Sequence, residues 1–239
     1  MGYGWRLRIG LIVPSSNTTM ESEFYMMAPE GVSIHTARML LREARAEALR
    51  EMSKDVERAA SLLSTAAVDV ILYGCTTGSL LGGCEWEKEL MERVQRSGKA
   101  LSFSTATAVV DALKELGAEK IVVATPYIEE LNALEKHFLE SHGFKVLEMR
   151  GLGLLRNLDI GREPPSTAYR LAREVFRPEA DAIFISCTNL RTIEVIEALE
   201  ADFARPVVTS NQASMWKVLR VGGVGERVFG YGRLLEECL

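Results

Sequence analysis

Histidine and cysteine, the residues from which zinc sites are usually built, are scarce in this chain of 239 residues. Only three histidines and four cysteines are present, and no two cysteines form a CxxC pair. A Cys/His zinc site needs closely spaced ligands of these kinds, so we expect no metal. A chain of this length buries enough apolar surface without disulfides, so we also expect free thiols.

Long apolar runs and basic clusters are missing as well. The apolar run near the N-terminus covers only residues 9–13, which is too short for a signal peptide or a membrane span. We therefore expect a cytoplasmic protein with no membrane partner. The 28 Lys and Arg residues against 33 Asp and Glu residues give a net charge of -5, so no nucleic acid partner is expected and an anionic substrate must be held by local donors.

Nucleotide-binding motifs and the serine-hydrolase motif GxSxG are also missing. The chain has no GxxxxGK[ST] and no GxSxG, and its glycine-rich stretches lack the complete GxGxxG that follows a strand. We therefore expect no dinucleotide cofactor.

What the chain does contain is a regular alternation of short apolar runs with longer amphipathic segments. Apolar periodicity over residues 47–66 and 127–143 predicts helices, the second ending at Gly143. Apolar strands that alternate with helices are typical of parallel sheets covered on both faces, which makes this an α/β protein. We expect strands at residues 8–13, 68–74, 100–104, 120–125, 145–149, 180–186 and 205–210.

A repeat lies on top of this alternation. When the sequence is shifted by 112 residues, the pair Cys75–Thr76 falls on Cys187–Thr188. Two of only four cysteines thus share one register, which favours a duplicated α/β unit over a chance match. We predict a first domain formed by residues 1–105 and 213–239, and a second formed by residues 106–212.

Each repeated cysteine lies at the end of an expected strand, where open parallel sheets bind ligands. A helix expected to begin near Ser79 would stabilise a Cys75 thiolate through its unpaired N–H groups. Thr76 and Thr77 follow, and their backbone amides would reach an anionic ligand. Two thiols on opposing walls suit covalent addition, or proton removal on one face and delivery on the other. The alternative for Cys75 alone is an inert buried cysteine.

Asn17 follows the strand expected at residues 8–13, so its amide is expected at the same rim as the cysteines. The neighbouring Thr18 and Glu21 have the spacing of a capping box, which would explain Thr18 without any function.

Other candidate ligands come from the second half. Tyr127 follows a proline that closes a strand, and its phenol can donate to an oxyanion. Asn157 lies in the polar segment 154–166, a loop long enough to cover a site. Thr188 is the counterpart of Thr76 in the repeat. Packing on a helix for Tyr127 and an ordinary turn for Asn157 are the alternatives.

These motifs resemble the maleate cis-trans isomerase and arylmalonate decarboxylase family, within the aspartate/glutamate racemase superfamily. The resemblance covers nearly the whole chain through the segments PSSNTTME, GCTTGS, TPY, NLDIGR and SCTN. It implies two pseudo-symmetric flavodoxin-like domains, each a parallel sheet flanked by helices, with the active-site cleft between them. It also implies chemistry without a cofactor, in which Cys75 and Cys187 are catalytic and Asn17, Tyr127 and Asn157 contact a small dicarboxylate substrate.

The activity that the resemblance implies is isomerisation of maleate to fumarate through a covalent cysteine adduct. A two-cysteine racemase for a small acidic compound and an arylmalonate-type decarboxylase are the alternatives. Glycine typically replaces Cys75 in the decarboxylases, which argues against that activity. The segment Thr188–Arg191 differs from the Val-Gln-Met-Pro type of sequence in the isomerases and looks closer to racemase-like members, so the substrate stays open. Such enzymes are commonly homo-oligomers, and we lean towards that state here.

Overall fold

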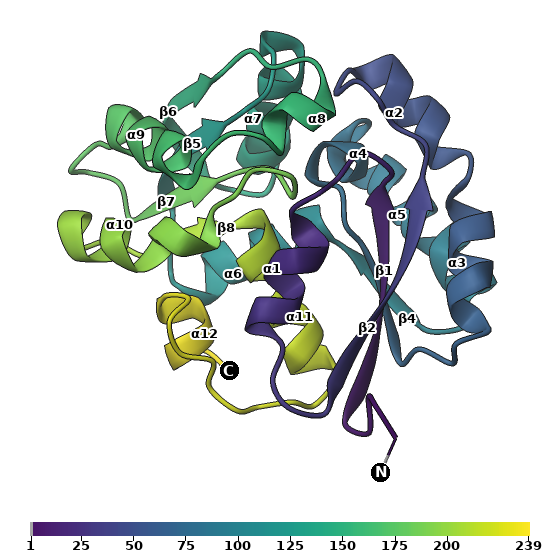
Figure 1. Ribbon diagram of the computed structural model, residues 1–239. Helices are drawn as coiled ribbons and strands as arrows, with labels where there is room; N and C mark the ends of the chain where they lie inside the picture. Colours follow the sequence, from purple (N-terminus) through teal and green to yellow (C-terminus); the bar gives the residue numbers. More distant parts are fainter. Residues whose placement is uncertain (1) are drawn as a thin grey trace.

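The computed structural model describes residues 2–239 and contains two four-stranded parallel sheets, which lie beside each other in Figure 1. Their strand orders are β2-β1-β3-β4 and β6-β5-β7-β8, so each strand of one sheet has a counterpart at the same place in the other. The strands are β1 (Leu7–Pro14), β2 (Val32–Met39), β3 (Val70–Tyr73), β4 (Leu101–Ser104), β5 (Lys120–Thr125), β6 (Lys145–Gly151), β7 (Ala182–Ile185) and β8 (Val207–Thr209).

Helices connect the strands and cover the sheets (Figure 1). They are α1 (Met20–Met27), α2 (Ala46–Ser53), α3 (Val56–Ser64), α4 (Thr76–Leu80), α5 (Gly83–Gly98), α6 (Thr105–Glu115), α7 (Glu129–Ser141), α8 (Asn157–Ile160), α9 (Pro165–Val175), the 3₁₀ turn η1 (Ile193–Val195), α10 (Ile196–Phe203), α11 (Ser210–Val221) and α12 (Arg233–Glu237). Among residues 2–239, no helix combines the length and the apolar character needed to cross a bilayer.

The repeat seen in the sequence is also a repeat of strand register. Ile9 pairs with Val70 in the first sheet, and Ile121 pairs with Ala182 in the second. Both residues of the second pair are displaced by the same shift that relates the two cysteines, so the two sheets are built alike. The predicted fold of two similar parallel α/β units is confirmed.

The chain crosses between the two units at helices α6 and α11. These two helices pack against each other, and α11 also contacts α1 and β3 of the first unit as well as β8 of the second. These contacts agree with the expectation that the C-terminal segment returns to the first half, while the exact boundaries at residues 105 and 212 stay a prediction.

Strand β2 has no counterpart among the strands expected from the sequence. It lies at the edge of its sheet, and half of its residues are only half-buried, including polar ones such as His35 and Thr36. An edge strand with one solvated face does not need the continuous apolar run by which buried parallel strands are recognised. The apolar signal was therefore weak for this strand.

Two helix boundaries also differ from expectation. The single helix expected over 47–66 is broken into α2 and α3 at Lys54 and Asp55, because Ser53 and Asp55 favour turns and caps over helix interiors. The helix expected near Ser79 begins three residues earlier, at Thr76, which makes Cys75 its N-cap residue. Gly143 follows α7 with a positive φ of 94°, as expected for the end of that helix.

Candidate active site

Cys75 lies between the end of β3 and the start of α4, with an extended backbone (φ −147°, ψ 104°). Its side chain is 5% exposed. The Thr77 hydroxyl and the Gly78 backbone N–H lie close enough to its sulfur to lower the pKa of the thiol. A Cβ atom added to Gly78 would lie 2.9 Å from that sulfur and 2.8 Å from the Tyr73 hydroxyl oxygen. Glycine at this position therefore lets the sulfur lie against the backbone of the first helical turn.

Cys187 follows β7 in the same way but with a different backbone. Its φ is +103°, in the left-handed region that favours glycine. Its N–H donates to Ser210 Oγ at 2.9 Å, and the Asn189 N–H donates to its sulfur at 3.3 Å. The Tyr127 phenol lies beside this sulfur and lowers the pKa of the thiol. A cysteine held in an unfavourable conformation by several hydrogen bonds is a common mark of a functional site.

The pKa values of both thiols are raised in this closed arrangement. Burial raises the pKa of Cys75 to about 12, and the nearby Cys187 adds to the increase. Burial likewise raises the pKa of Cys187 to about 11, against hydrogen bonds from Tyr127 and the backbone of Asn189. The expectation that the start of a helix makes Cys75 a thiolate is therefore wrong for the closed site. Desolvation outweighs the amide dipoles, and both sulfurs are protonated at neutral pH.

The two cysteine loops are joined by hydroxyl groups. Ser210 Oγ accepts the Cys187 N–H at 2.9 Å and the Thr76 hydroxyl at 3.0 Å, so one atom holds both loops. In parallel, Asn17 Nδ2 donates to Thr188 Oγ1 at 3.0 Å. Sequence reasoning missed Ser210, although it opens α11 directly after strand β8, at the same rim as the cysteines.

Asn17 also determines how α1 begins. Its side-chain oxygen accepts the N–H groups of Thr19 and Met20, each at 3.0 Å. The predicted capping box of Thr18 and Glu21 is therefore wrong: α1 starts at Met20, and Glu21 instead pairs with Arg38. An asparagine side chain competes well for these N–H groups, because it bonds to backbone two and three residues ahead.

Asn157 lies at the start of α8 and is buried. Its Nδ2 donates to Ser16 Oγ at 2.9 Å, and its backbone carbonyl oxygen accepts from Asn189 Nδ2 at 2.7 Å. Asn189 in turn accepts the N–H of Thr18 at 2.8 Å. Three loops from the two halves are thus tied together beside the cysteines, and Asn189 is a further member that the sequence reading did not assign.

Two buried carboxyl groups lie beside these loops and were also missed. Glu23 of α1 accepts the Thr192 N–H at 2.9 Å and the Asn211 side-chain amide at 2.6 Å. Burial raises the pKa of Glu23 to about 7. Glu135 of α7 accepts from the Ser186 hydroxyl at 2.6 Å. Both residues occur in amphipathic helices, where a glutamate normally indicates a solvated face, so no sequence signal marks them as buried.

The structure brings all predicted site residues to the strand ends and loops where the two halves meet, and each of them is buried. They are Asn17, Cys75, Thr76, Thr77, Tyr127, Asn157, Cys187 and Thr188. In the described part of the chain no group of three or more His, Cys, Asp or Glu side chains gathers in a way that could hold a metal ion.

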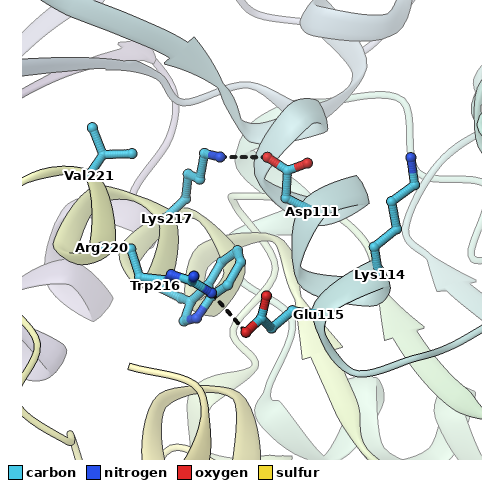
Figure 2. A pocket seen from close by; sticks show the side chains of 7 residues that line it. All are labelled: Asp111, Lys114, Glu115, Trp216, Lys217, Arg220 and Val221. Atoms are coloured by element: carbon cyan, nitrogen blue, oxygen red, sulfur yellow. Dashed lines mark hydrogen bonds and ion pairs between the residues drawn. The ribbon is translucent and has the colours of Figure 1, made fainter.

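A separate surface cavity of about 490 Å³ lies between α6 and α11 (Figure 2). Four of its five charged side chains form ion pairs: Lys217 pairs with Asp111 at 2.6 Å, and Arg220 pairs with Glu115 at 2.9 Å. The cavity is open and contains neither cysteine, so it is a poor candidate for the reactive site. Its lining residues are Asp111, Lys114, Glu115, Trp216, Lys217, Arg220 and Val221.

This fold and this pair of buried cysteines agree with what is known of related proteins. The family model for arylmalonate decarboxylase matches residues 9–235. A maleate isomerase of Nocardia farcinica is 32% identical over 240 residues, which cover 96% of both chains. The chain belongs to the arylmalonate decarboxylase family.

Solved structures of relatives superimpose over nearly the whole chain. A Nocardia farcinica maleate cis-trans isomerase, a cysteine-to-serine variant with a covalently bound succinylcysteine intermediate, matches with a TM-score of 0.92 and 30% identity over 97% of this chain and 98% of that one. A cysteine-to-alanine variant of the maleate isomerase from Pseudomonas putida S16, crystallised with maleate, has a TM-score of 0.92 and 29% identity over 96% of this chain and 97% of that one. The two-domain α/β architecture is thus shared with enzymes that carry cysteine chemistry.

Proposed function

We propose that this protein is a cofactor-independent cis-trans isomerase that converts maleate to fumarate through a covalent adduct of Cys75. The observation that carries the proposal is the pair of buried thiols, Cys75 and Cys187, supplied by equivalent loops of two duplicated units and close enough to affect each other's ionisation. The succinylcysteine in the Nocardia relative supports a covalent route on this fold.

The chemistry follows from the need to turn a double bond into a single bond for a moment. The Cys75 thiolate forms a bond to one alkene carbon, and the π electron pair moves to the other carbon and into its carboxylate. The Cys187 thiol gives that carbon a proton, and the central bond, now single, rotates. Cys187 then takes a proton back from the same carbon, the carbon–sulfur bond breaks, and the trans diacid leaves with the Cys75 thiolate restored.

The polar side chains around the cysteines are assigned to the charge that develops on the substrate. The backbone N–H groups of Thr76 and Thr77, the Tyr127 phenol and the amides of Asn17 and Asn157 are the proposed donors, with the Thr188 hydroxyl beside them. Burial raises the pKa of Tyr127 well above its usual range, so it stays a neutral donor throughout the physiological pH range. Fixed donors in a water-poor site stabilise such an oxyanion more strongly than water does.

The burial of both thiols has a consequence for catalysis. Both sulfurs are protonated there because burial raises their pKa values, whereas the reaction needs one thiolate. The proposal therefore requires that one thiol lose its proton before the carbon–sulfur bond forms.

A two-cysteine racemase for a small acidic compound is the second candidate, because the segment Thr188–Arg191 is unlike the corresponding sequence of the isomerases. Proton NMR in deuterated buffer separates the two, with maleate and small acidic amino acids in parallel samples. Fumarate formed from maleate supports the isomerase. Deuterium at the α-carbon of an amino acid, without fumarate, would support the racemase instead.

The cytoplasmic location, the homo-oligomeric state and the absence of a nucleic acid partner stay predictions from the sequence. Light scattering of the purified protein decides the oligomeric state.

A further inference from the structure

Glu135 is a buried carboxyl group that the proposed reaction does not use. It lies on α7 and is 1% exposed, and among residues 2–239 it has no ion-pair partner. One carboxyl oxygen, Oε1, is hydrogen-bonded to the Ser186 hydroxyl at 2.6 Å, while Oε2 is buried with no hydrogen-bond partner. A buried carboxylate with one bare oxygen is costly, whereas the neutral acid tolerates such a place.

The Ser186 hydroxyl connects this carboxyl to the reactive sulfur of the second half. Ser186 directly precedes Cys187 in the chain. Its hydroxyl donates to Glu135 at 2.6 Å and lies close enough to the Tyr127 phenol to lower the pKa of that phenol. The Tyr127 phenol in turn lies beside the Cys187 sulfur and lowers the pKa of that thiol. A serine hydroxyl has only one proton, so it cannot donate to both of its neighbours at once. Which neighbour receives it depends on whether Glu135 has a proton to donate.

We propose that Glu135 is a positioning residue, whose carboxylic acid proton orients the two hydroxyl groups between it and the Cys187 sulfur. When Glu135 is neutral, its O–H donates to Ser186, the serine donates to the phenol, and the phenol donates to the sulfur. When Glu135 is ionised, the serine turns back to the carboxylate, and the phenol loses a supporting donor. The inference rests on the proposed function, because that function assigns Cys187 as the acid/base partner of Cys75.

The surroundings of Glu135 leave this relay as its main polar contact. Of the elements packed against α7, α4 carries no titratable side chain, and β6 carries Glu148 and Arg150, which pair with Arg177 and Glu174. Lys145 on β6 is exposed, as are the charged residues of α7 itself. The titratable groups that face the carboxyl are Tyr127 and Cys187. Burial raises the pKa of Glu135 to about 8, which places its ionisation within the working range of an enzyme.

The test compares the wild-type protein with Glu135→Gln, because the glutamine amide keeps a donor and never ionises. Each protein is treated with iodoacetamide over a range of pH, and alkylation of the separate cysteine peptides is followed by mass spectrometry. Above pH 8 the variant lacks the carboxylate that opposes a Cys187 thiolate, so we expect the midpoint for Cys187 to fall by about one pH unit, or tenfold in rate at a given pH. The midpoint for Cys75 is the internal control and stays unchanged.

Turnover gives a second measure that does not depend on absolute activity. The ratio of variant to wild-type kcat is expected near one at pH 6, where Glu135 is neutral, and to rise about tenfold by pH 9.5. Adding Ser186→Ala to Glu135→Gln removes the link in the relay, so it should cancel most of the Cys187 shift.

Several results would overturn the relay. An unchanged Cys187 midpoint in folded Glu135→Gln protein is one, and a parallel shift of both thiols, which reports only easier opening, is another. If Glu135→Gln does not fold, Ser186→Ala alone must raise the Cys187 midpoint, and an unchanged value overturns the proposal. If the wild-type protein fails to convert maleate, the proposed function is lost, yet the alkylation comparison still decides the relay.

Discussion

The two cysteine loops occupy equivalent places in the duplicated units, yet they are built differently. Cys75 has an extended backbone and caps the helical turn that follows it, whereas Cys187 has a positive φ and is followed by an irregular segment before η1. The sulfur of Cys75 lies beside the Thr77 hydroxyl and the Gly78 amide. That of Cys187 accepts the Asn189 N–H at 3.3 Å and lies beside the Tyr127 phenol.

These differences support the proposal that the duplication has supplied two thiols with separate tasks. The first sulfur lies at the start of α4 beside a hydroxyl and a backbone amide, which suits the proposed nucleophile. The second is joined to a chain of proton-bearing groups that ends at a buried carboxyl, which suits an acid/base partner. Pseudo-symmetry fixes where the thiols lie, and the residues around each thiol decide what it does.

The largest effect is expected from exchanging the two thiols for inert groups. Cys75→Ala removes the nucleophile, so turnover of maleate should vanish while binding survives, as measured by calorimetry. Cys187→Ser keeps the nucleophile and removes an efficient proton donor, so kcat should fall by roughly 10²–10⁴. Intact-mass spectrometry should then detect an adduct of one diacid on Cys75 in the serine variant. Comparable activity in Cys75→Ala would break the assignment of separate tasks.

Next in size is the loss of the phenol on the second wall. Tyr127→Phe removes the phenol beside Cys187, whose one proton is the proposed donor to the developing oxyanion, and we expect kcat to fall by roughly 10²–10³. Steady-state kinetics measures this. If KM rises while kcat is unchanged, the phenol serves binding alone and the comparison of the two walls must be revised.

A smaller effect is expected from filling the space beside the first sulfur. Gly78→Ala would place a methyl group 2.9 Å from Cys75 Sγ and 2.8 Å from Tyr73 Oη, so one of these buried groups must move. We expect the free energy of unfolding to fall by about 1–3 kcal/mol, with slower alkylation of Cys75 and unchanged alkylation of Cys187. Chemical denaturation and peptide mass spectrometry measure the two quantities.

The smallest effect concerns Glu23, the carboxyl that connects α1 to the loop after Cys187. Its pKa is raised from 4.5 to about 7, so the folded state binds a proton that the unfolded state releases. The stability that this proton contributes is complete below pH 4.5 and is lost as the pH rises through 7. Glu23→Gln should therefore flatten the decline of the free energy of unfolding between pH 5 and 8, measured in urea. An equally steep decline in the variant would mean that Glu23 is ionised in both states.

The fold was predictable from the sequence where burial on both faces of a sheet requires a continuous apolar run. Strands β3 and β7 are apolar throughout because both faces of a parallel sheet are covered, and their matching cysteines exposed the duplication. Strand β2 was not predicted, because an edge strand tolerates polar residues. The break at Asp55 was not predicted either, because apolar periodicity continues across it.

The candidate site was predictable as far as position in the chain determines position in space. Strand ends of a parallel sheet converge, which brought Asn17, Tyr127 and the cysteines to one rim. Ser210 and Glu135 could not be recognised, because their importance comes from contacts with residues far away in the sequence. The ionisation of Cys75 was misjudged for a related reason: the helix start is a local feature, whereas desolvation depends on the other half of the molecule.

The positive φ of Cys187 is an unfavourable backbone conformation for a cysteine, whereas a glycine would adopt it without strain. Replacing Cys187 by glycine should thus yield a protein that melts at a higher temperature and no longer turns over its substrate. Such a result would indicate that the Cys187 sulfur is needed for reactivity and that the cysteine lowers the thermal stability of the protein.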